Sequence, residues 1–348
     1  MRGGPIGVAN FNPGRTHMFK FKKSRYIKRS TKDSFFVEEK KKRPIVPLII
    51  IGAVFLFLIL FSIVGLRYGE KITVDRATVV SAQIPESFDG FKILHLSDLH
   101  GKEFGENQKN LLKVIEELDY DMVVFTGDYS AKGADQDLWV LRDLLAGLKE
   151  NVPIYYVLGD CDYTPPNVSD TSDRWKMCIM PEKDLPVMGV FREYNGMFVY
   201  PAQKYTNAAG DSIYLTSISY DRETLNKMDF DQEMDFSICV THKPINYNVT
   251  RRLRDMNKRT ITEVDYDLCL SGHTLGGQVR VPILGALYSE EEGFFPQETS
   301  LRGISKDDAG RYTYINAGLG VENGFRFFSN PEVSIIELKR PAETAVED

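Results

Sequence analysis

The spacing of apolar and polar positions changes several times along the chain, and the first change is the sharpest. Residues 44–66 form a continuous apolar run without a single charged residue or a polar face. About 20 apolar residues in helical form cross the hydrocarbon core of a bilayer. A cleaved signal peptide would have a shorter apolar core, followed closely by a cleavage site of small residues. Residues 44–66 are therefore predicted to be an uncleaved transmembrane signal anchor.

A repeated rhythm of strand and helix begins at residue 91. Apolar runs typical of strands cover residues 91–98, 121–128 and 152–160. Between them, residues 106–119 and 135–150 carry apolar side chains at helical spacing. Strand, helix, strand, helix, strand in units of about 30 residues predicts a parallel sheet covered by helices.

The second half of the body has a different pattern. Residues 188–221 alternate and turn in the way that antiparallel strands do. Two apolar runs follow, at residues 236–242 and 266–273, and two more strand candidates lie at residues 310–320 and 331–339. Together the two halves predict one α/β domain, built from two sheets with helices outside.

Charge is distributed unevenly around the apolar run. Residues 1–43 carry 13 Lys or Arg and 3 Asp or Glu, whereas the chain after residue 66 carries 30 basic and 46 acidic residues, a net charge of −16. The more basic flank of an anchor stays in the cytoplasm, so the acidic body is expected on the extracytoplasmic side of the plasma membrane. An acidic body also argues against nonspecific binding of nucleic acid.

Five parts are expected along the chain. Residues 1–43 are a basic, disordered cytoplasmic head with little to bury, and residues 44–66 are the anchor. Residues 67–87 are a linker that contains a candidate edge strand. Residues 88–339 are the main domain, and residues 340–348 are a tail.

Four cysteines, Cys161, Cys178, Cys239 and Cys269, all lie in the body, and none forms a Cys-x-x-Cys pair. A structural zinc knuckle is not indicated. One or two disulfides are compatible with an extracytoplasmic location, but the spacing does not show them. Cys239 and Cys269 lie inside apolar runs, which favours buried free thiols at these two positions.

Acidic residues stand at the ends of the three predicted parallel strands. Asp98, Asp128 and Asp160 each follow one apolar run. Ligands of open α/β sheets bind beyond the carboxyl ends of the strands. Three carboxylates gathered at that edge would repel one another unless a cation or protons lay between them. This placement predicts a metal site.

Three histidines also lie at or just after the ends of predicted strands. His242 and His273 end two apolar runs, and His100 lies two residues after Asp98, where alternate side chains of an extended segment point the same way. Imidazole with carboxylate suits Mn, Fe or Zn better than Ca or Mg. His95 lies inside its strand and is interpreted as a core histidine instead.

The ordered motifs SDLHG, TGDY, LGDCDY, VTHKP and SGHTLGGQ resemble those of the calcineurin-like metallophosphoesterases, in particular a membrane-anchored bacterial branch. The resemblance covers roughly residues 88–339. It implies an α/β fold, a four-layer αββα sandwich of two mixed β-sheets, and a site for two divalent metal ions. The first ion would take Asp98, His100 and Asp128. The second would take Asp128, Asp160, His242 and His273.

Two motifs depart from the family pattern. Where the family has Gly-Asn-His-Asp, this chain has Asp160, Cys161 and Asp162 after the glycine. Asp160 remains a candidate ligand. Cys161 and Asp162 occupy the positions of the catalytic histidine and its orienting acid, although a thiol is a poor hydrogen-bond donor. Leu275 replaces the second histidine of His-x-His, so the first ion is expected to bind more weakly, by at least about 10–100-fold.

The implied function is a membrane-anchored, extracytoplasmic phosphoesterase, which hydrolyses phosphodiester or pyrophosphate bonds through a metal-bridged hydroxide. Its location suggests a phosphorylated small molecule, a lipid or a cell-envelope polymer as substrate. The altered motifs leave an alternative open. In that alternative, the domain is catalytically degenerate and binds a metal or a phosphorylated envelope ligand without turnover.

Overall fold

The computed structural model describes residues 45–131, 137–162, 185–217, 228, 230–231, 235–245, 266–289, 293–296, 301–322 and 324–342. The predicted head, residues 1–43, and Cys178 lie outside these ranges. The chain divides into two compact units, residues 1–51 and residues 52–348. Every strand in the described ranges belongs to the second unit.

The predicted anchor is a helix, α1, spanning Ile45–Tyr68. Its mean hydropathy is 3.0, and within the described ranges it alone is long and apolar enough to cross a membrane. Almost all of its side chains are exposed, as expected for a surface that faces lipid. Length and composition thus agree with the predicted anchor.

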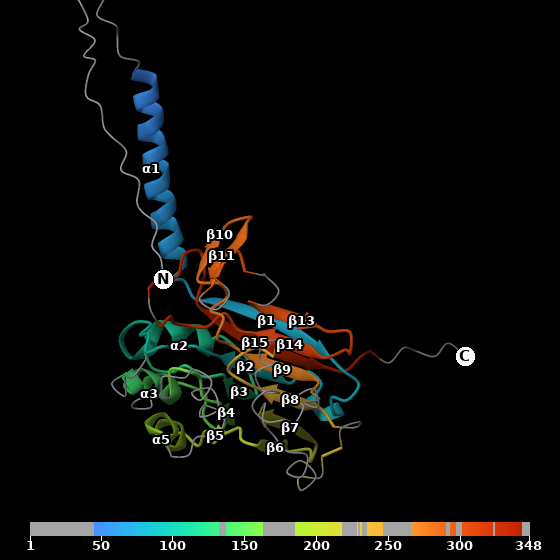
Figure 1. Cartoon of the computed structure of the whole chain (residues 1–348). Coiled ribbons are helices and arrows are strands. Elements are labelled where there is room, and N and C mark those ends of the chain that lie inside the picture. The colour runs from blue at the N-terminus through green and yellow to red at the C-terminus, as the bar shows by residue number, and fades with distance from the viewer. Residues whose placement is uncertain are drawn as a thin grey trace, which may run out of the picture. The chain divides into compact units, whose positions relative to one another are not determined.

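The first large sheet has the strand order β1-β15-β2-β3-β4-β5 (Figure 1). Its strands are β1 (Thr73–Val80), β15 (Glu332–Lys339), β2 (Lys92–Leu96), β3 (Met122–Phe125), β4 (Ile154–Tyr156) and β5 (Met197–Phe198). Strands β2 to β5 are parallel, as the strand–helix rhythm predicts. β15 runs antiparallel to β2, and the predicted edge strand β1 pairs in parallel with β15.

Helices cover one face of this sheet. They are α2 (Lys109–Glu116), α3 (Leu138–Ala146) and α5 (Pro186–Glu193), and two short 3-10 helices are η1 (Glu86–Phe88) and η2 (Glu106–Gln108). Leu94 and Leu96 of β2 pack toward these helices, in one apolar cluster with Leu111 of α2. The predicted helices at residues 106–119 and 135–150 are confirmed, with shorter bounds.

Residues 186–193 correct the sequence-based expectation of antiparallel strands. They form α5, because Pro186 occupies the first turn and the apolar residues Val187, Val190 and Phe191 recur at helical spacing. All three are buried. The alternation of residues 188–221 holds only after α5, because the helical spacing of Val187, Val190 and Phe191 covers barely two turns.

The second large sheet has the order β13-β14-β9-β8-β7-β6. Its strands are β13 (Gly303–Lys306), β14 (Tyr312–Ile315), β9 (Leu268–Ser271), β8 (Ser237–Val240), β7 (Ser212–Ser217) and β6 (Ala202–Thr206). β7, β8, β9 and β14 are parallel, and both edges are antiparallel. The predicted α/β fold with two mixed sheets is confirmed, while helices on the far face of this sheet would lie outside the described residues.

The two large sheets pack face to face. Ile93 of β2, Ile238 of β8 and Leu268 of β9 belong to one buried apolar cluster between them. His95 is buried and points into the same layer, where its Nε2 lies 3.0 Å from the Thr126 hydroxyl and its ring meets that of Tyr314. The interpretation of His95 as a core histidine agrees with this position.

A third, smaller sheet follows the SGHTLGGQ segment. It consists of β10 (Val279–Val281), β11 (Gly285–Ser289) and β12 (Gly293–Phe294), all antiparallel. Figure 1 shows β10 and β11 standing away from the two large sheets. The side chains at its turn are exposed, so this sheet is not part of either core.

Candidate metal centre

The predicted ligands of the first sheet meet at the carboxyl ends of neighbouring parallel strands. Asp98 follows β2 and Asp128 follows β3. The Asp98 amide donates to the Gly127 carbonyl at 2.9 Å, and the His100 amide donates to the Asp128 carbonyl at 2.9 Å. Asp98, His100 and Asp128 all have left-handed backbones, with φ of 51°, 46° and 57°. Such conformations cost of order 1–3 kcal/mol each and persist at functional sites when their surroundings fix them.

Two glycines allow the ligand loops to approach closely. Gly127 has φ of 96°, and a side chain there would collide with the backbone of Gly159. A side chain on Gly159 would in turn collide with the carboxylate of Asp128. The Gly-Asp pairs of TGDY and LGDCDY are therefore needed for close packing of one loop on the other.

The second sheet supplies the two histidines. His242 follows β8, and its Nδ1 lies 2.7 Å from the Thr126 carbonyl, to which it donates. This bond leaves Nε2 to face Asp128, 3.2 Å from its Oδ2. The His273 amide donates to both carboxylate oxygens of Asp98, at 3.2 and 3.0 Å, and His273 Nδ1 lies 3.1 Å from His242 Nε2.

Two groups of donor atoms result, each with all its atoms within 4.8 Å of one another. One contains His100, Asp128 and Cys161, and the other contains Asp128, His242 and His273. Asp128 belongs to both, which is the position expected for a carboxylate shared by two ions. The first group also includes a donor that the sequence did not suggest as a ligand, the Cys161 sulfur.

The spacing around His100 fits an ion better than direct contact. His100 Nε2 lies 3.9 Å from Asp98 Oδ1 and 3.7 Å from Asp128 Oδ2, both too long for hydrogen bonds. Its Nδ1 is buried without a hydrogen-bond partner. Two donors that each lie ~2 Å from one ion sit about 3–4 Å apart. Imidazole and carboxylate donors at this spacing suit Mn, Fe or Zn.

Asp160 is placed differently from the other acids. Its Oδ2 lies 2.6 Å from Lys243 Nζ, an ion pair that Asp98 does not have among the described residues, although Asp160 and Asp98 both lie outside the two donor groups. Lys243 is a partly buried partner of this acid. The pair arises because the loops after β4 and β8 meet at the same edge.

Asp162 acts on the backbone of the ligand loops. Its carboxylate accepts hydrogen bonds from the amides of Asp128, Tyr129 and Gly159, each at 2.8 Å. By position in the motif, Asp162 is the acid that orients the family's histidine, which is Cys161 in this chain. The structure shows that it fixes the Gly127–Tyr129 turn and the Gly159 turn together.

Asp128 changes the pKa values of the groups around it, and they change its own pKa. Burial alone would raise the pKa of Asp128, but His242, His100 and the Cys161 amide hold it well below the usual range. Burial opposes protonation of His242, yet Asp128 and other acids raise its pKa to about 10. Burial and the Asp128 charge raise the pKa of the Cys161 thiol. The opposite shifts of Asp128 and His242 have one main cause, the short contact between their side chains.

Arg326 ties this site to the chain that follows it, and sequence reasoning missed it. The side chain is 4% exposed. It donates to the carbonyls of Leu275 at 3.1 Å, Ala317 at 2.8 Å and Gly320 at 2.7 Å. Its signal in the sequence is a single cation among three phenylalanines, Gly-Phe-Arg-Phe-Phe. Only tertiary contacts show that this cation is buried.

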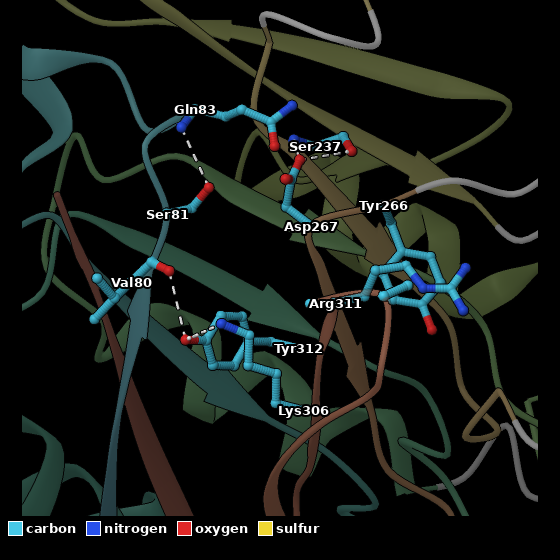
Figure 2. Close-up of a pocket in the computed structure, with 11 residues that line it drawn as sticks. Val80, Ser81, Gln83, Ser237, Tyr266, Asp267, Lys306, Arg311 and Tyr312 are labelled. Carbon is cyan, nitrogen blue, oxygen red and sulfur yellow. Dashed lines mark hydrogen bonds between the residues drawn. The ribbon is translucent and has the colours of Figure 1, made fainter. Parts of the chain in front are cut away.

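A separate pocket of about 320 Å³ lies at the opposite edge of the sheets. Figure 2 shows its lining, including Val80 at the end of β1, Ser237 at the start of β8 and Tyr312 at the start of β14. None of the predicted site residues lines it. The candidate site is the buried cluster at the carboxyl ends.

Comparisons with known proteins identify the family of the chain. The model of the calcineurin-like phosphoesterase family matches residues 91–277, so the chain belongs to that family, whose members are metal-dependent hydrolases of phosphoric esters. The metallophosphoesterase YkuE of Bacillus subtilis is 27% identical over 78% of this chain and 88% of its own length.

Two further matches are a bacterial enzyme and a solved structure. The UDP-2,3-diacylglucosamine pyrophosphatase LpxG of Chlamydia muridarum is 24% identical over 75% of this chain and 88% of its own. Among solved structures, the phosphopantetheinyl hydrolase PptH of Mycobacterium tuberculosis aligns with a TM-score of 0.35 at 12% identity, covering 68% of this chain and 91% of that one.

Proposed function

We propose that this chain is a single-pass, membrane-anchored phosphoesterase that uses two divalent ions to hydrolyse phosphodiester or pyrophosphate bonds on the extracytoplasmic side. One observation carries the proposal. Asp98, His100, His242 and His273 converge around the buried Asp128 at the carboxyl ends of the parallel strands. The anchor α1 and the basic head before it support the location.

In this proposal Asp98, His100 and Asp128 hold the first ion, with the Cys161 sulfur close enough to contribute. Asp128, His242 and His273 hold the second, with Asp160 available once Lys243 moves away. Bound ions would neutralise the phosphoryl oxygens and supply a nucleophile at neutral pH. Thr126 fixes the tautomer of His242, and Asp162 holds the two ligand loops in register. Leu275 offers no donor, so we expect the first ion to be the weaker one.

The leaving group limits the substrate class. Cys161 stands where the family places a histidine. Neither a thiol nor a metal-bound thiolate carries positive charge, and a sulfur donates hydrogen bonds poorly or not at all. Substrates should therefore have leaving groups that depart without protonation, such as pyrophosphates and activated diesters. The pyrophosphatase activity named for the relative LpxG, on a diacylated sugar nucleotide, favours a phosphorylated lipid.

The test compares full-length wild-type protein with the Asp128→Asn variant in detergent. After dialysis, bound metal is measured by elemental analysis, and hydrolysis of bis-p-nitrophenyl phosphate is followed with added Mn²⁺. We expect two binding steps in the wild type, one of them weaker. Asp128→Asn should lose about 100-fold or more in metal affinity, because it removes the shared ligand, and its turnover should be lost as well.

Asp119→Asn is the matched control, since Asp119 is an exposed acid that pairs with Lys92. It should keep wild-type metal content and activity. If the wild type binds one ion or none and shows no turnover above Asp128→Asn with Mn²⁺, Fe²⁺ or Zn²⁺, the hydrolase proposal is wrong. The Lys243–Asp160 pair would then favour the second candidate function, binding of one metal or a phosphorylated envelope ligand without catalysis.

The orientation has its own test. Alkaline phosphatase fused after residue 348 should be active in intact bacterial cells, whereas the same fusion after residue 43 should be inactive. Equal or reversed activities would contradict an extracytoplasmic domain.

A further inference from the structure

The small sheet β10–β12 exposes large apolar side chains. Ile283 is 105% exposed, Leu284 74%, Phe294 77% and Phe295 78%. We call these four residues the apolar hairpin. Ile283 and Leu284 lie at the β10–β11 turn, and Phe295 donates its amide to Leu287 of β11 at 2.9 Å. All four thus belong to one small sheet, and apolar residues grouped in this way on a surface mark a binding site.

The base of this sheet is joined to the end of α1 through residues 325–328. The Arg280 amide donates to the Phe327 carbonyl at 2.8 Å, and the Phe327 amide donates to the Gln278 carbonyl at 3.0 Å. Next along the chain, the Phe328 amide donates to the Gly65 carbonyl of α1 at 3.0 Å. β10 is therefore linked to the last turns of the anchor by backbone hydrogen bonds.

Side chains reinforce this junction. The Phe61 ring lies 5.8 Å from that of Phe327 and 5.0 Å from that of Phe328. Gly65 makes the contact close, because any side chain there would collide with the Phe327 ring. The Tyr68 ring lies 5.6 Å from that of Phe328, tilted by 41°, and it ends the helix with an aromatic group of the kind enriched at membrane interfaces.

We propose that the apolar hairpin inserts into the lipid interface beside the point where α1 leaves the bilayer. The contacts above place its sheet at the last turns of the predicted anchor, where lipid is the nearest apolar phase. The chain after residue 66 carries a net charge of −16. So acidic a body disfavours anionic headgroups, and the preferred surface is a neutral, zwitterionic interface.

The inference does not depend on catalysis, and its test needs no substrate. Full-length protein, with both native tryptophans, Trp139 and Trp175, replaced by Phe, is reconstituted in phosphatidylcholine vesicles. A single tryptophan is then introduced by Ile283→Trp, by Phe294→Trp or, as the control, by Val80→Trp. Val80 is 41% exposed and lies at the pocket on the opposite edge of the domain. Quenching by lipids brominated along the acyl chain reports contact with hydrocarbon.

We expect at least twofold stronger quenching at positions 283 and 294 than at position 80, with a blue-shifted emission that salt does not reverse. Quenching at 283 and 294 equal to that at 80 would overturn the proposal. A blue shift without bromolipid quenching, varying with the protein-to-lipid ratio, would also overturn it, because a second copy of the chain would then be the occupant.

Discussion

The candidate metal centre, called here the ligand edge, and the apolar hairpin are close in the chain, and they depart from normal burial in opposite ways. At the ligand edge, the charged side chains of Asp98, Asp128 and His242 are buried. Ten residues or more after His273, Ile283 and Leu284 are exposed. Buried charge and exposed hydrocarbon are both costly when left alone.

The difference between the two regions indicates what each one lacks. A bound cation would offset the charge of buried acids that lie at ligand spacing from imidazoles. An apolar phase such as lipid would remove an exposed apolar turn from water. Arg326 connects the regions, because it holds the Leu275 carbonyl on one side and stands beside Phe327 on the other. Substitutions that disturb only one of the two regions should show how much each region contributes to the stability of the fold.

The largest effect is expected from Arg326→Met, which tests whether the ligand edge depends on its junction with the anchor. Several buried carbonyls would lose their donor, at about 1–3 kcal/mol each before relaxation. We expect a net loss of about 3 kcal/mol, which lowers Tm by roughly 6–12 °C in a domain of this size. Thermal unfolding of the full chain in detergent measures the shift.

Arg142→Met is the control for this variant. Arg142 pairs with Glu193 in two short but exposed hydrogen bonds, and exposed pairs contribute about 0–1 kcal/mol. If both variants lower Tm equally, burial of Arg326 adds nothing, and the two regions are not mechanically linked through it.

A smaller effect on stability is expected from His95→Gln. This variant tests how much of the loss of stability at acidic pH comes from the buried core and how much from the ligand edge. Burial lowers the pKa of His95 to about 3, whereas the unfolded value is near 6.5. As the pH falls from 6.5 toward 3, the unfolded state binds a proton that the folded state does not. Stability is therefore lost by up to about 1.4 kcal/mol per pH unit. His95→Gln removes this slope and keeps a hydrogen-bond partner for Thr126.

Thermal unfolding in the presence of a chelator, at pH 7.5, 5.5 and 4.5, measures the slope without bound metal. The variant should lose less stability than the wild type on acidification. Parallel curves for the two proteins would show that His95 does not titrate on unfolding, and acid sensitivity would then belong to the ligand edge.

The smallest effect on stability is expected at the apolar hairpin. Ile283→Asn and Leu284→Asn remove apolar area that is already exposed, so Tm in detergent should change by less than the equivalent of about 0.5 kcal/mol. Leu275→Asn, at a buried position of the ligand loop, is the contrasting variant and should be clearly destabilising. A large loss of Tm at Ile283 would mean that the hairpin packs against the domain rather than facing lipid.

Much of this architecture could be predicted from local patterns. Asp98, Asp128, His242 and His273 each follow an apolar run, and parallel pairing brings those ends together. Their role as ligands stays a prediction until metal is measured. Nothing local could reveal the Lys243–Asp160 pair or the burial of Arg326, because both depend on loops distant in sequence. The exposure of Ile283 and Leu284 could not be predicted either. A pair of apolar residues has the same sequence pattern whether it faces a protein core or a membrane.

The position of β15 has a consequence for the order of synthesis. This last strand lies between β1 and β2, which are among the first made. Roughly 240 residues separate the end of β2 from the start of β15. At roughly 5–20 residues per second, a ribosome takes about 10–50 s to bridge that gap. Throughout this interval β1 and β2 lack their shared neighbour, so a nascent chain stalled before residue 332 would present two open strand edges to chaperones and proteases.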